Sequence, residues 1–102
     1  MAKFLKQTGV CPDGTPVMAG VFVLVDTHGV PLTTAVELLQ GKGVMPDWLD
    51  FYQSALRVGW KPVGILSKMD EAVLDVYGTV FRDAWRIRLF ECLNALGIPV
   101  PG

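Results

Sequence analysis

The sequence has 102 residues, of which 51% are hydrophobic and 19% are charged, and its formal net charge at pH 7 is −1. A chain of this length fits one domain, and its apolar content is sufficient for a core. The near-neutral charge lacks the long-range positive field that draws non-specific binders to phosphate backbones. We therefore expect a single domain over residues 1–102, with nucleic acid as a possible but not a favoured partner.

The residue pattern contains no motif of a metal centre, a redox site, a cofactor site or a membrane segment. Cys11 and Cys92 lie far apart, and neither has a second cysteine or a histidine at the spacing of a zinc or redox motif. The apolar run from residue 17 to 25 has nine residues, far fewer than the ~20 that a helix needs to cross a bilayer. We expect a cytoplasmic protein with reduced thiols, no cofactor, no metal and no membrane contact, and with Cys92 on the inner face of its last helix.

Residues 1–14 resemble an N-terminal arm that ends in a turn, because Pro12–Gly14 combines proline, aspartate and glycine. Thr15 followed by Pro16 is typical of a helix start, and Gly29 is typical of a helix end. The residues between these signals are almost all apolar. They predict a helix that is buried on every side.

The same apolar run also suits a β-strand, since valine is common in strands and a short apolar run has no decisive periodicity. In this alternative the fold is α+β, and the arm pairs with residues 17–25 in a hairpin that turns at Pro12–Gly14. We favour the helix, because both boundary signals fit it and no other strand of comparable quality is present.

Four further helices are expected from their boundary signals and their apolar stripes. They begin near Thr34, Pro46, Pro62 and Thr79 and end near Gly41, Gly59, Tyr77 and Gly97. Thr34 and Glu37 have the spacing of a capping box, and Val80 is placed on the inner stripe of the last helix. The favoured fold is all-α, with about five short-to-medium helices in one compact irregular bundle and an extended tail at residues 98–102. One continuous, kinked helix through Gly78 is the alternative for the last two.

Asp26 and His28 stand two residues apart at the corner after the first helix. A carboxylate beside an imidazole can form a general base, but no nucleophile or metal motif accompanies this pair. A lone histidine also cannot supply the three or four ligands of a zinc site. We expect His28 to lie in the last turn of the helix as a cap, and we favour a protein that is not an enzyme.

Arg82 and Arg86 are four residues apart on the last helix and therefore share a face. They are a candidate site for an anionic partner. The simpler interpretation, which we favour, is a solvated face on which they pair with Asp75, Asp83 or Glu91. A nucleic-acid regulator would have to use this helix, because the start of the third helix is acidic.

The sequence is rich in aromatic residues for its length, and Trp48 and Trp60 are candidate partner-binding residues because Trp48 stands near a helix start and Trp60 beside a loop. For either of them taken alone, a place in the core is the interpretation that we favour. Monomers seldom expose large apolar patches, so a surplus of such residues favours self-association. We expect a small non-enzymatic interaction or adaptor protein, a homodimer that uses apolar and arginine-bearing helix faces. The alternatives are a nucleic-acid-associated regulator and a small enzyme or small-molecule binder with an aromatic-lined pocket.

Overall fold

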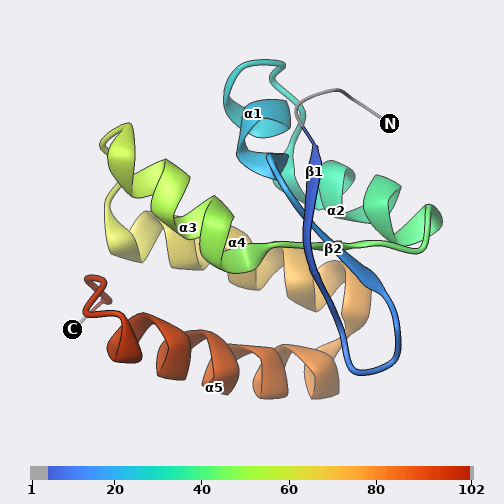
Figure 1. The fold of residues 1–102 in the computed structure, drawn as a ribbon. Helices are drawn as coiled ribbons and strands as arrows, with labels where there is room; N and C mark the ends of the chain where they lie inside the picture. Colours follow the sequence, from blue (N-terminus) through green and yellow to red (C-terminus); the bar gives the residue numbers. More distant parts are fainter. Residues whose placement is uncertain (1–4, 102) are drawn as a thin grey trace.

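The computed structural model describes residues 5–101, which form five helices and a small three-stranded sheet (Figure 1). The strand order is β1-β2-β3. The prediction of about five helices is correct, but the N-terminal part is a sheet, so the all-α prediction holds only in part and the α+β alternative fits. The elements are β1 (Lys6–Val10), β2 (Pro16–Ala19), α1 (Val21–Asp26), α2 (Leu32–Gly41), β3 (Met45–Pro46), α3 (Trp48–Arg57), α4 (Pro62–Tyr77) and α5 (Thr79–Ala95).

β1 and β2 form an antiparallel hairpin, and β3 pairs in parallel with the other edge of β2. The turn lies where Pro12–Gly14 predicted it, closed by a hydrogen bond of 2.9 Å from the Gly14 N–H to the Cys11 carbonyl. Gly14 has a φ of 91°, a value that glycine adopts without strain. Residues 6–10 of the predicted arm therefore belong to the sheet, whereas residues 1–4 and 102 lie outside the described part of the chain.

The apolar run is divided at Gly20 into a strand and a short helix, which corrects the prediction of one helix from Thr15 to Gly29. Pro16 begins a strand, a position that proline tolerates as well as a helix start. Gly20 has φ 98° and ψ 0°, a left-handed conformation that changes the chain direction. Its N–H donates a hydrogen bond of 3.0 Å to Oδ2 of Asp50 on α3. This hydrogen bond, between residues 30 positions apart in the sequence, helps to stabilise the change of chain direction at Gly20.

Two other helix boundaries differ from the sequence prediction. α1 ends at Asp26, so His28 lies beyond the helix rather than in its last turn. α2 begins at Leu32 behind Pro31, with no side-chain cap, so Thr34 is inside the helix and the predicted capping box is not used. At α3 the prediction was closer, since Asp47 is the N-cap and its Oδ1 accepts a hydrogen bond of 3.0 Å from the Asp50 N–H.

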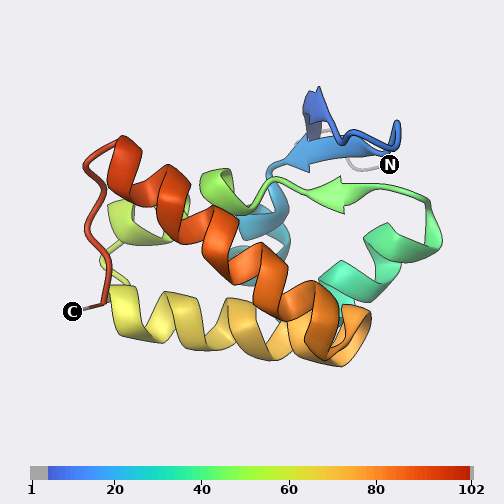
Figure 2. The same ribbon diagram turned by 90° about the horizontal axis from the view of Figure 1, so that it is seen from below.

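α4 and α5 are separate helices, as predicted, and Gly78 is the junction between them. Its φ of 89° and ψ of 176° turn the chain back, so that α5 crosses α4 and forms the outermost layer (Figures 1 and 2). On the two sides of the junction, the rings of Tyr77 and Phe81 stack at a centroid distance of 4.4 Å. The direction of α5 is therefore fixed locally.

One core joins α1–α5, and Phe51, Tyr52 and Ile65 are among its fully buried side chains. The C-terminal tail packs against it through Ile98 and Val100. The Tyr52 hydroxyl donates a hydrogen bond of 2.6 Å to the Pro99 carbonyl. The tail is thus attached to the side of the molecule, which leaves the outer side of α5 uncovered by any part of residues 5–101 (Figure 2).

Candidate functional site

α5 carries apolar side chains on the side that faces away from the core. Its inner side buries Trp85, Leu89 and Leu93. On the outer side, Val80 is 88% exposed and Ile87 is 62% exposed. Val80 was expected on the inner stripe, but it lies nine residues before Leu89, which at ~100° per residue is half a turn away.

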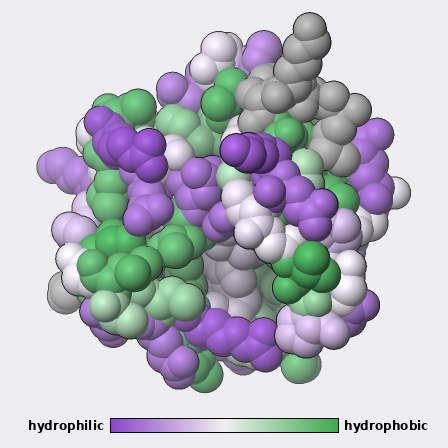
Figure 3. Space-filling view, viewed as in Figure 1, coloured by the Kyte–Doolittle hydropathy of each residue, from purple (hydrophilic) through white to green (hydrophobic). Residues whose placement is uncertain are grey.

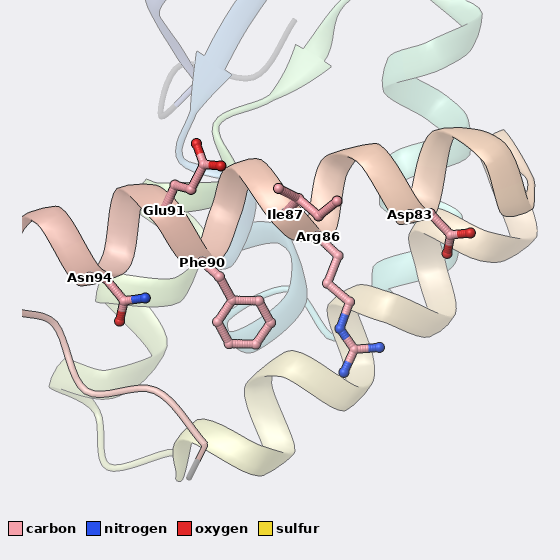
Figure 4. A pocket seen from close by; sticks show the side chains of 6 residues that line it. All are labelled: Asp83, Arg86, Ile87, Phe90, Glu91 and Asn94. Atoms are coloured by element: carbon pink, nitrogen blue, oxygen red, sulfur yellow. The ribbon is translucent and has the colours of Figure 1, made fainter.

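Five residues follow one another along this outer side at alternating steps of three and four, and we call them the α5 seam. They are Val80, Asp83, Ile87, Phe90 and Asn94, of which Phe90 is half-buried and lies at the edge of the core, whereas the other four are exposed. This spacing keeps side chains in one line along a helix and is the spacing by which two helices pair. Figure 4 shows the last four of them on consecutive turns of α5. The heptad spacing is present in the sequence, but the prediction did not include it.

The surface around the seam is a shallow hollow of about 560 Å³ (Figure 4). All of its lining residues come from α5, namely Asp83, Arg86, Ile87, Phe90, Glu91 and Asn94. Because one helix cannot enclose a small molecule, this surface is unsuited to bury most of a ligand, as small-molecule sites do. It is open enough to accept another helix.

The two predicted partner-binding arginines have different environments. Arg82 is bound on both sides, with Nε 2.8 Å from Asp83 and Nη1 3.0 Å from Asp70. These hydrogen bonds, first to Asp83 and then to Asp70, raise the pKa of the Arg82 guanidinium above its usual value. Pairing with Asp83 was the simpler interpretation of the sequence, whereas Asp70 on α4 was not foreseen. Arg82 is therefore already engaged within the chain.

Arg86 is held more loosely. Its Nη1 lies 3.7 Å from Oδ1 of Asp70, and its side chain is 48% exposed. The guanidinium also lies 5.9 Å from the ring centroid of Phe90, and Figure 4 shows the two side chains on the same side of α5. Of the two arginines, Arg86 is the one available to a partner.

Trp48 and Trp85 form the floor of a second hollow, which we call the tryptophan groove. Their rings meet edge to face, with centroids 5.6 Å apart and planes at 72°. Each residue is less than a tenth exposed, and neither indole Nε1 has a hydrogen-bond partner within residues 5–101. A buried donor without an acceptor costs on the order of 1–3 kcal/mol. Trp48, one of the predicted partner-binding residues, is thus largely a core residue with an unsatisfied polar atom.

The tryptophan groove has a volume of about 510 Å³ and lies between the β1–β2 hairpin, β3, the start of α3 and α5. In Figure 3 the molecular face is hollowed below its centre, between patches of hydrophobic side chains. Cys11 lines the groove from the hairpin and Cys92 from α5, and both are free thiols. Cys92 is exposed, which corrects its expected place on the inner face of α5. Four separate elements thus build a site whose volume is in the range of ligand pockets.

Tyr77 has a buried hydroxyl that makes no hydrogen bond within the described residues. Burial, with a smaller contribution from the charge of Cys11, raises the pKa of the Tyr77 phenol to about 12. At neutral pH the phenol is therefore protonated, and its buried oxygen is in no position to act as a base.

Trp60, the other predicted aromatic partner site, packs into an aromatic cluster. Its ring lies edge to face with Phe22 at 5.2 Å and with Phe51 at 6.3 Å, measured between centroids. Lys68 Nζ lies 6.0 Å from the ring centroid. Trp60 therefore lies at the edge of the core, in a different cluster from Trp48 and Arg86.

The side chains that could ligate a metal ion do not cluster within residues 5–101. No three His, Cys, Asp or Glu side chains come together there as metal ligands. The His28 N–H donates to the Val23 carbonyl at 3.2 Å, so the backbone of His28 helps to close the end of α1. Within the same range, none of the helices has the length and apolar character that a membrane span requires.

Comparisons with known proteins give no relative of this chain. No protein-family model, no curated protein and no solved structure matches the chain.

Proposed function

We propose that the protein is a small non-enzymatic interaction protein that self-associates through the outer side of α5. One observation carries this proposal: Val80 and Ile87 are 88% and 62% exposed on a helix whose opposite side is anchored in the core. Large apolar side chains aligned on one exposed surface are typical of interaction sites. The self-associating adaptor predicted from the sequence thus gains a specific surface.

The energetics favour a weak and reversible association. Burying a fully exposed valine or isoleucine side chain contributes about 1.5–3 kcal/mol. The seam spans 15 residues from Val80 to Asn94, or ~21 Å of helix at 1.5 Å per residue. A contact of this length is small by the standard of stable dimers. We therefore expect dissociation constants in the micromolar range or above.

Sedimentation velocity over a concentration series up to about 0.5 mM, a range that covers weak affinities, tests the proposal. We expect a monomer–dimer equilibrium that Ile87→Asp shifts to the monomer, because the new carboxylate would be desolvated in the interface. Leu38→Asp is the matched control, since Leu38 is 54% exposed on α2, away from α5. A wild-type chain that stays monomeric throughout would refute the proposal, as would a dimer that Leu38→Asp disrupts and Ile87→Asp does not.

Small-molecule binding is a second candidate function, favoured by the tryptophan groove. The polar groups that lack a partner there are both donors, the indole N–H groups of Trp48 and Trp85. The Asp47 carboxylate nearby already accepts hydrogen bonds from Thr8 and Asp50. A fitting ligand would be apolar with an accepting oxygen, and a movement of the indoles would have to accompany its binding. Native mass spectrometry of the purified protein tests this, and a ligand-free spectrum would argue against it.

A further inference from the structure

The seam residues also contain information on how two copies are oriented. We infer that α5 pairs in parallel with α5 of a second copy, so that Arg86 of each copy meets Glu91 of the other. This inference rests on the proposed self-association. The occupant of the seam is thus a second copy of this chain. The orientation follows from the heptad positions of the seam and its flanks.

Within the heptad, one set of seam residues recurs every seven positions and is rich in β-branched side chains. Val80, Ile87 and Asn94 occupy the position called a, and Asp83 and Phe90 occupy position d. In parallel two-stranded coiled coils, β-branched residues are favoured at a. A single asparagine at a is a device that specifies register and the number of strands, because its amide pairs with the same amide across the axis. Asn94 is exposed and suited to that role.

The charged residues that flank the seam distinguish the two possible orientations. Arg86 precedes Ile87 and is at position g, and Glu91 follows Phe90 and is at position e. In a parallel pair, g of one helix faces e of the other helix five residues later, which brings Arg86 to Glu91 on both edges of the interface. In an antiparallel two-fold pair, position g of one helix faces position g of the other and e faces e, so Arg86 does not meet Glu91 of the second copy. Charge complementarity therefore selects the parallel pair.

Arg86 and Glu91 are both accessible for an ion pair with a second copy. Arg86 lies 3.7 Å from Asp70, whose other oxygen is already held by Arg82 at 3.0 Å. Glu91 is exposed and makes no ion pair within residues 5–101. To reach the second copy, the Arg86 side chain has to rotate away from Asp70 Oδ1, an atom that makes no hydrogen bond within residues 5–101.

Asp83 is the least favourable seam residue, because a parallel pair brings two of these carboxylates close together. Each carboxylate carries its own counter-charge, since Arg82 Nε is 2.8 Å from Asp83 Oδ1. Asp83 also lies near the end of the seam, where its side chain is 64% exposed. Water and Arg82 together limit the repulsion, and this residue helps to explain why the association is weak.

Cysteine cross-linking tests the orientation directly. In a Cys11→Ser and Cys92→Ser background, Asn94→Cys is oxidised with oxidised glutathione, which takes two electrons and two protons from a pair of thiols as their disulfide forms. We expect a covalent dimer from Asn94→Cys alone, because the parallel pair places residue 94 beside its own copy. An antiparallel pair would instead give cross-links only when Asn94→Cys is mixed with Asp83→Cys, and that result would overturn the inference.

Charge reversal provides the second measurement. Arg86→Glu alone should weaken dimerisation about tenfold, since two exposed ion pairs become two repulsive contacts. The double variant Arg86→Glu with Glu91→Arg should restore the wild-type affinity. If the wild-type chain dimerises but Asn94→Cys gives no covalent dimer, or if Arg86→Glu has no effect, the parallel pairing is wrong while the proposed self-association stands. A wild-type chain that stays monomeric would refute both the parallel pairing and the proposed self-association.

Discussion

The junction at Gly78 gives the sharpest test of how the chain positions the outer side of α5. Its φ of 89° and ψ of 176° belong to a region that is essentially restricted to glycine. A Cβ built on Gly78 meets no heavy atom within 4 Å. In Gly78→Ala, the cost is therefore that of the backbone conformation alone, without a steric clash against a neighbour.

The expected cost is about 1–3 kcal/mol, which is the strain of holding a non-glycine residue in such a region. Gly64 inside α4 is a matched control, because its Cβ would also enter open space and its backbone is helical. Gly64→Ala should stabilise the protein by about 0.5–1 kcal/mol, since alanine loses less conformational freedom in a helix. The same chemical change thus has opposite signs at two positions 14 residues apart.

Urea unfolding, monitored by circular dichroism, measures both variants, and for a domain of this size 1 kcal/mol also corresponds to about 4–8 °C in Tm. The unfolding m value should stay unchanged, as expected when only the stability differs. A stability for Gly78→Ala equal to or above that of the wild type would refute the reasoning. It would show that alanine at residue 78 carries no backbone strain.

Two further predictions concern individual side chains. Asp47→Ala should destabilise the fold by about 1 kcal/mol, because the α3 N-cap loses its hydrogen bond of 3.0 Å from the Asp50 N–H. Thr34→Ala should be near neutral in the same urea titration, since α2 has no side-chain cap. Equal losses of stability in the two variants would contradict this prediction. Tyr77 holds its proton more tightly in the folded state, with a pKa of about 12 against 10.0, so its contribution to stability is complete below pH 10 and is lost as the pH rises towards 12. Tyr77→Phe should lack this component of the pH dependence, and the tyrosinate absorbance that it loses at 295 nm should be the part that appears near pH 12. Loss of the part that appears near pH 10 would contradict this.

The later helices were predictable because their signals are local. Asp47 caps α3 through the backbone three residues ahead, and Pro62 begins α4 at a position where its missing N–H is not needed. Gly78 separates α4 and α5 through its own φ and ψ. In each case the residue that determines the boundary lies within one turn of it.

The N-terminal part was less predictable because its structure depends on distant partners. Residues 17–25 are apolar enough for a strand or a helix, and the chain uses both, with Gly20 between them. The break is supported by the Asp50 carboxylate, and β2 gains its second neighbour from β3. A two-residue strand such as Met45–Pro46 has no sequence pattern of its own. No local reading of the chain could have located these contacts.

The candidate surface was only partly visible in the sequence. Arg86 was identified from its spacing, but Arg82 belongs to an ion-pair network with Asp70, 12 residues earlier on α4. Ile87 and Phe90 were not singled out, because the inner and outer sides of α5 both contain apolar residues and periodicity alone did not separate them. The buried stripe of α5 had to be located before the exposed seam could be recognised.

The distribution of apolar residues on α5 is the physical reason to look for a second copy. A helix that is apolar on several sides is normally covered on several sides. α5 is the outer layer of the fold, and nothing among residues 5–101 covers Val80 or Ile87. In the proposed parallel pair, Arg86 and Glu91 of the two copies are complementary charges that flank the seam. The same two side chains would then determine the orientation, because an antiparallel alignment does not bring them together.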